Sequence, residues 1–239
     1  MIDLEKHGDI FTLTMDAGEN RWNTTFVREI AKALDEVEAS SGPAALITTA
    51  SSEKFYSNGL DLAWVQSPDE HPEAGDRGVF GDEFMKVMSR MITFPVPTIA
   101  AINGHAFGAG FMFALCHDVR HMREDRGFVC ANEMQLGMRI PKPELALFRH
   151  KLPMNTYFET VQLARRWAGP DALAAGIVQN ISSEEKLLEV AQHRAAELAP
   201  LGANRDLYGG QKETIFGENA IINEPHGAAY MLRNLEEYH

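Results

Sequence analysis

The stretch PTIAAINGHAFGAGFMFALCHD, residues 97–118, determines how the rest of the chain can fold. Its apolar opening, Thr98 to Ile102, has the length of a buried strand, and Asn103-Gly104 ends that strand with a turn signal. The small residues 108–110 then lead into the apolar run Phe111 to Cys116, which predicts a fully buried helix. Small residues let a ligand approach the first N–H groups of such a helix, which have no intrahelical partner. The turn can therefore bind an anionic oxygen.

The composition predicts one principal domain in a reducing compartment. With 239 residues, of which 45% are hydrophobic, the chain can build one sizeable core. A formal net charge of -12 argues against a general nucleic-acid or membrane surface, because both need clustered Lys and Arg. Cys116 and Cys130 lack ligand spacing and are expected to be buried free thiols. The charged opening MIDLEKHGDI does not fit a signal peptide, so we expect a cytoplasmic protein.

Strands and helices are expected to alternate, which favours parallel crossover units over hairpins. The predicted strands are Ile10–Met15, Ala44–Thr49, Thr98–Ile102, Val119–Met122 and Phe128–Cys130. The predicted helices run from Thr24 to the Ser41-Gly42-Pro43 break and over Phe84–Ile92, Phe111–Cys116, Leu145–Lys151, Thr156–Arg165, Pro170–Ala175 and Glu184–Leu198. The polar segment Pro68–Gly81 is expected to be a surface loop that forms a lid or rim.

Three segments in order resemble the enoyl-CoA hydratase/isomerase (crotonase) superfamily. KFYSNGLDL (54–62) is similar to its apolar strand with a small-residue, Gly-x-Asp turn. AAINGHAFGAG (100–110) is similar to its Asn-Gly and Gly-x-Gly signature, and WAGPDALAAGIVQNI (167–181) to its Ala-rich helix. The resemblance extends from about Ile10 to Leu198.

The resemblance implies an α/β fold built as a spiral of strand-strand-helix turns with a helical C-terminal region. We expect a spiral core over residues 1–198 and a helical extension of the same domain over 199–239. The family implies an acyl-CoA thioester substrate, no separate cofactor, no metal, and assembly as a homotrimer or a dimer of trimers.

The resemblance also implies an oxyanion hole made by the backbone N–H groups of Leu60 and Ala109. Removing a proton next to a thioester carbonyl leaves negative charge on its oxygen, and donors aimed at that oxygen lower the barrier. Hydratases of the family use two glutamates, and the first of these positions is Met112 here, which cannot move a proton.

The second glutamate position matches Glu133, in NEMQLG, a stretch that also resembles the 3,2-enoyl-CoA isomerases with their single carboxylate. We therefore expect Glu133 to take a proton from C2 of a 3-enoyl-CoA and return it at C4. An apolar wall, for which Phe111, Met112, Met134 and Leu136 are candidates, would raise its pKa for that task.

Two alternatives stay open. In the first, Glu144 or Glu124 replaces the missing acid and the protein is a hydratase, although Glu144 beside two prolines also fits a helix start. In the second, the protein binds acyl-CoA without catalysis. Asp118 is expected to be structural, and His117 and His121 are expected to be packed or surface residues rather than metal ligands.

The remaining candidate substrate-binding residues come from the same matched segments. They are Arg21, Trp22, Ser57, Asn58, Gly59, Asp61, Gly108 and Met112. Arg21 and Lys54 are candidate phosphate partners or solvated charges, and Trp22 either covers the coenzyme or belongs to the core. Asp61 fits a turn-stabilising role as well. The acyl chain is expected to run along Phe84, Met88 and Phe111, residues that at helical spacing also fit plain core.

Overall fold

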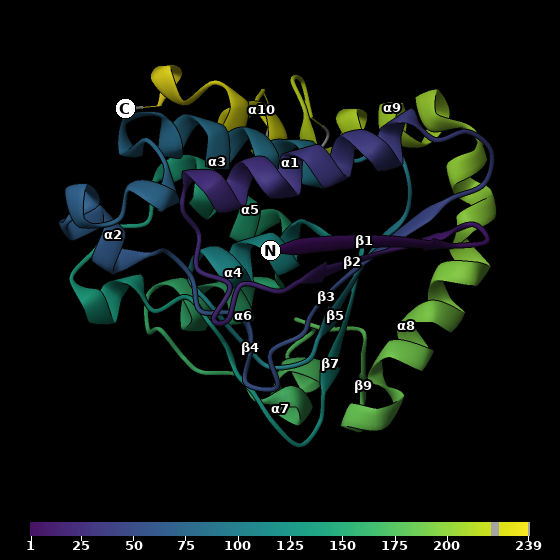
Figure 1. The fold of residues 1–239 in the computed structure, drawn as a ribbon, viewed down its shortest axis with the longest axis horizontal. Helices are drawn as coiled ribbons and strands as arrows, with labels where there is room; N and C mark the ends of the chain where they lie inside the picture. Colours follow the sequence, from purple (N-terminus) through teal and green to yellow (C-terminus); the bar gives the residue numbers. More distant parts are fainter. Residues whose placement is uncertain (221–224, 239) are drawn as a thin grey trace.

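The computed structural model describes residues 1–220 and 225–238 (Figure 1). Its main sheet has the strand order β1-β2-β3-β5-β7-β9. These strands are β1 (Ile2–His7), β2 (Ile10–Met15), β3 (Ala45–Ala50), β5 (Thr98–Ile102), β7 (Val119–Arg123) and β9 (Asn180–Ser182). All neighbouring pairs from β2 onward are parallel, which confirms the expected crossover units. The pair β1 and β2 is an antiparallel hairpin that the sequence reasoning missed, because β1 is a charged, mostly exposed edge strand.

A second, small parallel sheet has the order β4-β6-β8. Its strands are β4 (Phe55–Ser57), β6 (His105–Phe107) and β8 (Val129–Cys130). Each of them follows a main-sheet strand in the chain, and a helical segment comes next. The molecule is therefore built from repeated strand-strand-helix turns, as the family resemblance implied.

Helices cover both faces of the main sheet (Figure 1). On one face, α1 (Thr24–Ala39), α3 (Arg77–Ile92) and α4 (Ala109–Cys116) enclose the larger core. On the other face, α8 (Glu184–Leu198) packs its small residues Ala191 and Ala195 against β3 and β5. Every residue of α4 is buried, as the apolar run predicted.

The second half of the chain is mostly helical, as predicted. It contains α5 (Lys142–Lys151), α6 (Met154–Val161), α7 (Gly169–Ala174), α8, η4 (Ala199–Ala203), α9 (Arg205–Phe216), α10 (Ala228–Arg233) and η5 (Leu235–Glu237). Helix α6 ends four residues earlier than predicted, and Ala164 beyond it has a positive φ of 50°, which no helix contains. Helix α10 packs on α3 of the same chain, where Ser89 donates a hydrogen bond of 2.6 Å to the Ala229 carbonyl.

The boundary at residue 198 stays a prediction, and the extension 199–239 includes residues 221–224 and 239, which lie outside the described residues.

The polar segment 68–81 is more ordered than a plain loop. After α2 (Leu62–Gln66) it contains the single turns η1 (Pro68–Glu70) and η2 (Pro72–Ala74). It also contains the first turn of α3, which begins at Arg77 rather than at the predicted Phe84. The Asp76 side chain caps this helix by accepting a hydrogen bond of 2.7 Å from the Gly78 amide. The apolar pattern could not show this start because the first turn is exposed.

Candidate active site

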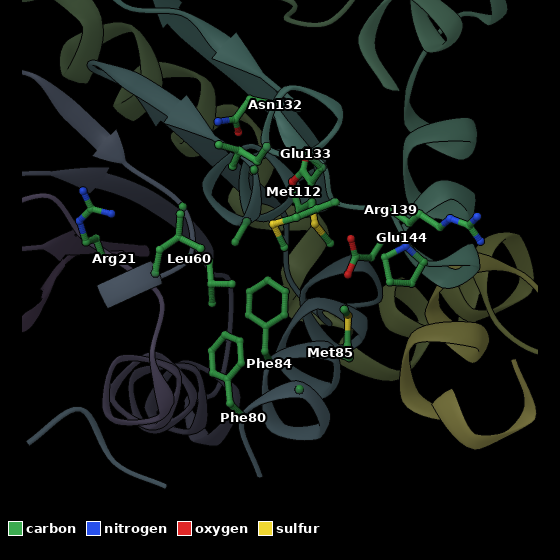
Figure 2. Close-up of a pocket in the computed structure, with 18 of the residues that line it drawn as sticks. Arg21, Leu60, Phe80, Phe84, Met85, Met112, Asn132, Glu133, Arg139 and Glu144 are labelled. Atoms are coloured by element: carbon green, nitrogen blue, oxygen red, sulfur yellow. The ribbon is translucent and has the colours of Figure 1, made fainter. Parts of the chain in front are cut away.

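A cavity of about 330 Å³ lies where the turns after β4, β6 and β8 meet helices α3 and α5 (Figure 2). It is lined by Arg21, Asn58, Gly59, Leu60, Leu62, Phe80, Gly81, Phe84, Met85, Gly108, Ala109, Met112, Asn132, Glu133, Leu136, Met138, Arg139, Pro141 and Glu144. Two carboxyl groups, two glycine turns and a set of apolar side chains therefore share one space.

The two glycine turns are in contact. A side chain on Gly59, which has a φ of 81°, would meet the Phe107 carbonyl oxygen at 2.7 Å and the Ala109 nitrogen at 3.8 Å. Only glycine adopts such a backbone without strain and without a clash here. The predicted pair Leu60 and Ala109, each directly after a glycine of positive φ, is thus brought to the same cavity.

The backbone hydrogen bonds around Leu60 leave the Leu60 amide without an acceptor. Trp22 pairs with the two residues that flank Leu60: its amide donates to the Gly59 carbonyl at 2.8 Å, and its carbonyl accepts from the Asp61 amide at 3.0 Å. Within the described part of the chain, neither the Leu60 nor the Ala109 amide donates a hydrogen bond. Both N–H groups are available to an oxygen atom in the cavity.

Glu133 stands directly beside the second glycine turn. It opens the short turn η3 (Glu133–Leu136), and its Oε1 lies 2.9 Å from where a side chain on Gly108 would begin. Its Oε2 is buried and has no hydrogen-bond partner among residues 1–220 and 225–238. Burial raises the pKa of Glu133, against a smaller opposing hydrogen bond from its own backbone. A carboxyl group with an unpaired oxygen thus lies beside the turn that carries Ala109.

Glu144 faces the same cavity from another element. It lies in the first turn of α5, as the prolines suggested, but its side chain is buried, with 9% exposed. Burial, and then the charge of Glu133, raise the pKa of Glu144 to about 8. Figure 2 shows both carboxyl groups pointing into the cavity on the side where Met112 lies. The site therefore contains a second acid, although Met112 occupies the position matched to the first glutamate of hydratases.

The rest of the cavity surface is largely apolar. We name Phe80, Phe84, Met85, Met112, Leu136 and Met138 the apolar wall. Phe80 and Phe84 stack with ring centroids 5.5 Å apart. Phe84, Met112 and Leu136 had been expected from the sequence. Phe80, Met85 and Met138 were missed, and the spacing of four between Phe80 and Phe84 is the signal that could have found the first of them.

Three expected wall residues lie elsewhere. Met88 is fully buried and touches Cys116 across the core, at 3.7 Å between their sulfur atoms. Phe111 is fully buried and packs edge-on against Phe148, and Met134 is exposed. None of them lines the cavity. Met88 and Phe111 lie on the sides of α3 and α4 that face the core and not the cavity.

Trp22 and Ser57 belong to the core and not to the cavity surface. Trp22 is completely buried, and its indole N–H donates to the Ser57 hydroxyl at 3.0 Å. The Ser57 hydroxyl donates in turn to the Asn20 carbonyl at 2.7 Å. The idea that Trp22 covers the coenzyme is therefore wrong, because its ring is fully enclosed and meets Phe26 at a centroid distance of 5.1 Å. Behind the cavity, both residues support the turn that carries Leu60.

The candidate cations and Asp61 lie at or beyond the edge of the cavity. Arg21 lines it but forms an ion pair of 2.6 Å with Glu19. Lys54 does not line it, and its ammonium group lies 4.8 Å from the centre of the Phe55 ring. Asp61 caps α2 by accepting from the Trp64 amide at 3.4 Å, so it stabilises the turn, as its alternative role predicted.

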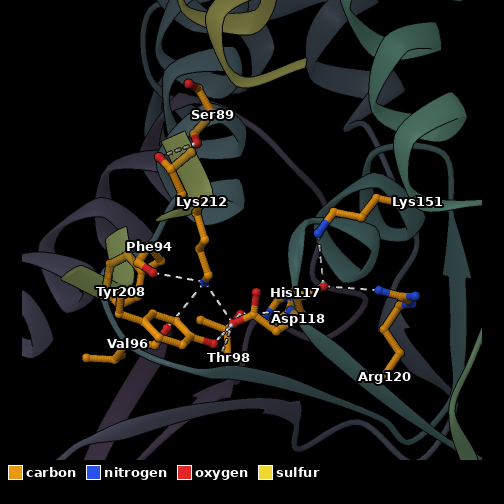
Figure 3. Close-up of polar contacts among 11 residues, drawn as sticks. Ser89, Phe94, Val96, Thr98, His117, Asp118, Arg120, Lys151, Tyr208 and Lys212 are labelled. Carbon is orange, nitrogen blue, oxygen red and sulfur yellow. Dashed lines mark hydrogen bonds and ion pairs between the residues drawn. The ribbon is translucent and has the colours of Figure 1, made fainter. Parts of the chain in front are cut away.

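The other acids and histidines are placed away from the cavity. Glu124 is exposed after β7 and does not line it, so the alternative in which Glu124 supplies the second acid is wrong. Asp118 is bound within the polar cluster of Figure 3. His117 is buried between Thr48 and the Phe113 carbonyl, and burial lowers its pKa to about 3. Among the described residues, no three His, Cys, Asp or Glu side chains gather as they would around a metal ion.

No helix in the described ranges has the length and apolar character needed to span a membrane.

Comparisons with known proteins agree on one family. The family model described as enoyl-CoA hydratase/isomerase matches residues 5–206. Enoyl-CoA delta isomerase 2, peroxisomal, of Arabidopsis thaliana is 32% identical over 223 residues, which are 91% of this chain and 93% of that one. Enoyl-CoA delta isomerase 3 of the same plant is 32% identical over 222 residues, 91% of this chain and 93% of the relative. Carnitinyl-CoA dehydratase of Salmonella typhi is 33% identical over 167 residues, 68% of this chain and 62% of that protein.

Solved structures share the fold. An enoyl-CoA hydratase/isomerase family protein from Pseudomonas syringae superimposes with a TM-score of 0.79 at 25% identity, covering 90% of this chain and 89% of that one. A probable enoyl-CoA hydratase from Mycobacterium tuberculosis gives a TM-score of 0.78 at 24% identity, with 89% and 86% covered.

Proposed function

Because this chain belongs to the enoyl-CoA hydratase/isomerase family, we propose that it is an acyl-CoA double-bond isomerase. The reaction converts a 3-enoyl-CoA to the 2-trans-enoyl-CoA, a step of fatty acid metabolism. The observation that carries this proposal is the unpaired Glu133 oxygen beside two unpaired amides, those of Leu60 and Ala109, in one partly apolar cavity.

The chemistry follows from this arrangement. Glu133 takes a proton from C2, which gives a dienolate whose negative charge rests on the thioester oxygen. When this dienolate is protonated at C4, its electrons form the new C2=C3 bond. The Leu60 and Ala109 amides hold that oxygen, and removing one such donor typically costs about 3 kcal/mol of transition-state stabilisation. The former C3=C4 electrons take up a proton at C4. In the simplest form of this mechanism, Glu133 gives to C4 the proton that it removed from C2.

The raised pKa of Glu133 supports both halves of this cycle. A carboxyl group of ordinary pKa is a weak base and is almost never protonated at neutral pH, whereas burial brings its two forms closer in free energy. The names of the Arabidopsis thaliana relatives, enoyl-CoA delta isomerases, support the same reaction.

One observation favours a second candidate, a hydratase or dehydratase. Adding water across a double bond needs one group to activate the water and another to give a proton, and Glu144 is a second carboxyl in the cavity. The similarity to carnitinyl-CoA dehydratase points the same way. We place this second, because Met112 stands where the family's hydratases have their first glutamate.

A pair of substrates tests the proposal. The protein is incubated with a 3-enoyl-CoA and, separately, with a 2-enoyl-CoA. Absorbance measures the gain of a conjugated double bond from the 3-enoyl-CoA and the loss of the conjugated double bond from the 2-enoyl-CoA. We expect rapid conjugation and little hydration. Glu133→Gln keeps the shape of the side chain and removes the base, so conjugation should fall by about 10³-fold while CoA binding remains. The matched control is Glu124→Gln on the surface.

Other outcomes would overturn the proposal in distinct ways. Hydration faster than conjugation would identify a hydratase. Tight binding of acyl-CoA without turnover of either substrate would identify a binding protein. Full activity in Glu133→Gln would remove Glu133 from the mechanism.

Assembly, cofactor requirement and location remain proposals. We propose a homotrimer or a dimer of trimers, no cofactor besides the coenzyme A of the substrate, and a cytoplasmic location. Light scattering coupled to size-exclusion chromatography measures the first of these directly.

A further inference from the structure

Glu144 is a buried carboxyl group without a partner. Only 9% of the residue is exposed, and no hydrogen bond or ion pair to its carboxyl is found in the described ranges 1–220 and 225–238. Glutamate is rarely buried without a partner, because losing water without gaining a hydrogen bond costs free energy. Such a group calls for an explanation, and a ligand that occupies the cavity supplies one.

The surroundings of Glu144 are apolar or acidic. Helix α3 presents Met85, α4 presents Met112, and the segment before α5 presents Met138 and Pro141. The charged groups that line the cavity with it are Glu133, Arg139 and Arg21. Figure 2 shows Arg139 extending away from the cavity and Arg21 at its far edge. Glu133 is thus the charged group that Glu144 faces.

When two carboxyl groups share one site, the negative charge of the first strongly raises the pKa of the second. The pair therefore holds one proton and one negative charge. Burial raises the pKa of both groups, and the charge of Glu133 adds to burial at Glu144, whose pKa reaches about 8, so at neutral pH the proton resides on Glu144. The ligand-free cavity already contains one base and one acid.

We infer that Glu144 gives the proton to C4 of the substrate while Glu133 removes the proton from C2. This inference rests on the proposed isomerase function and replaces the single-carboxyl return step with a two-carboxyl relay. Glu133 and Glu144 come from different elements, η3 and α5, so each can face its own carbon of the substrate.

The step balances in atoms and charge. The C2–H bond breaks and its proton goes to Glu133, while the double bond moves from C3=C4 to C2=C3. The O–H bond of Glu144 breaks and its proton forms the new C4–H bond. The cavity then holds a neutral Glu133 and an ionised Glu144. Proton exchange with water after product release restores the starting pair, with no net change.

Isotope transfer distinguishes the relay from a single-carboxyl return. A 3-enoyl-CoA deuterated at C2 is converted in ordinary water, and the deuterium at C4 of the product is measured by mass spectrometry. In the wild-type protein we expect mostly hydrogen at C4, because Glu144 carries a solvent proton. In Glu144→Gln the amide has no acidic proton to give, so Glu133 returns the deuterium. The deuterium fraction at C4 should then rise several-fold and kcat should fall at least tenfold.

Two further variants make the result decisive. Glu144→Asp keeps an acid and should restore low deuterium transfer, which a merely structural role of Glu144 would not do. Glu124→Gln, on the surface, should match the wild type in both readouts. Thermal melting of each variant checks that it is folded.

The outcomes separate this inference from the proposed function. Equal deuterium fractions at C4 in wild type and Glu144→Gln, whether high or low, would overturn the relay while leaving the isomerase intact. No isomerisation by the wild-type protein would overturn both. The infrared band of a protonated carboxyl provides a test without turnover: it should be present in the wild-type protein at neutral pH and reduced in Glu144→Gln. Its absence would also overturn the relay.

Discussion

Two regions of this molecule hold buried or half-buried carboxyl groups, and the surroundings of these groups differ. In the polar cluster of Figure 3, Asp118 accepts hydrogen bonds from the Thr98 amide at 2.9 Å, the Tyr208 hydroxyl at 3.1 Å and the Lys212 ammonium at 2.7 Å. In the cavity of Figure 2, the Glu133 Oε2 has no hydrogen-bond partner, and neither Glu133 nor Glu144 pairs with a cation in the described part of the chain.

The difference teaches that a carboxyl group with bound partners holds elements of the fold together, whereas one without a paired cation stays available to a ligand. The hydrogen bonds of Asp118 join β5, the end of α4 and α9, so this carboxyl group holds the three elements together. Lys212 also donates to the Phe94 carbonyl at 2.9 Å, and burial lowers its pKa. The cavity acids have no paired cation, and burial raises their pKa values, helped at Glu144 by the charge of Glu133.

The largest effect on stability should come from removing the partnered acid. Asp118→Ala leaves the Lys212 ammonium buried without its counterion, and breaking a buried pair in this way typically costs about 3–5 kcal/mol. Urea denaturation of the variant and the wild type measures the free energy of unfolding. Glu144→Leu is the matched substitution in the cavity, and we expect it to be neutral or stabilising. A loss below about 1 kcal/mol for Asp118→Ala would remove the contrast between the two regions.

A smaller effect, on activity, should come from closing the gap between the glycine turn and the base. Gly108 has a φ of 48°, and a methyl group there would lie 2.9 Å from the Glu133 Oε1. Gly108→Ala should displace Glu133 and the Ala109 amide, lowering kcat/KM about 10²-fold, the size of losing one oxyanion donor.

Gly8→Ala is its matched control. Gly8 also has a positive φ, of 60°, but nothing lies within 4 Å of an added methyl group, so only backbone strain is shared between the two variants. Equal kcat/KM in the two variants would show that strain, and not the position of Glu133, limits the activity.

A smaller effect than that of Gly108→Ala should come from the titration of Glu144, and it should appear in the pH dependence of stability. Because the pKa of Glu144 is raised to about 8 on folding, the folded state holds a proton that the unfolded state has already lost above its ordinary pKa. Its contribution to stability is complete below that ordinary pKa and is lost as pH rises toward about 8, by up to about 1.4 kcal/mol per pH unit.

Glu144→Gln should lack this slope, and melting curves of both proteins between weakly acidic and weakly basic pH measure the difference. The comparison has to be made against the variant, because burial lowers the pKa of Lys151 to about 8 as well. Parallel pH profiles for the two proteins would mean that Glu144 is ionised in the folded state. Activity should decline over the same range, as Glu144 loses the proton that it gives to C4.

The smallest effect should come from the rim of the cavity. Arg21 is already paired with Glu19, and exposed pairs of this kind contribute about 0.2–1 kcal/mol. Arg21→Ala should therefore raise KM by less than about fivefold and leave kcat unchanged. A larger rise in KM in steady-state kinetics would mean that Arg21 leaves Glu19 to bind a phosphate of the coenzyme.

The sequence predicted most of the fold because each turn of the spiral leaves a local signature. Glycines that need a positive φ, such as Gly59 and Gly108, mark the turns, and the short apolar runs before them mark buried strands. The hairpin β1 and the first turn of α3 were missed because their surfaces are exposed and polar. In such segments, pairing and capping determine the structure, and hydrophobic periodicity carries no signal.

The site was harder to predict than the fold, for a physical reason. Glu133 was found through its motif, but whether a residue faces a cavity or the core depends on contacts between distant elements. Trp22 and Phe111 follow the same patterns as cavity residues and are core. Glu144 was predicted either to start a helix or to be a substitute acid, and the structure places it in the first turn of α5 and on the surface of the cavity.

Helix α10, near the end of the chain, rests on both α3 and α5. Those two helices carry Phe84 and Met85 of the apolar wall on one side and Glu144 on the other. Helix α10 thus supports two walls of the cavity from behind, although none of its residues lines the cavity. Substitutions in α10 could therefore reshape the cavity by moving α3 and α5, with every lining residue left as it is.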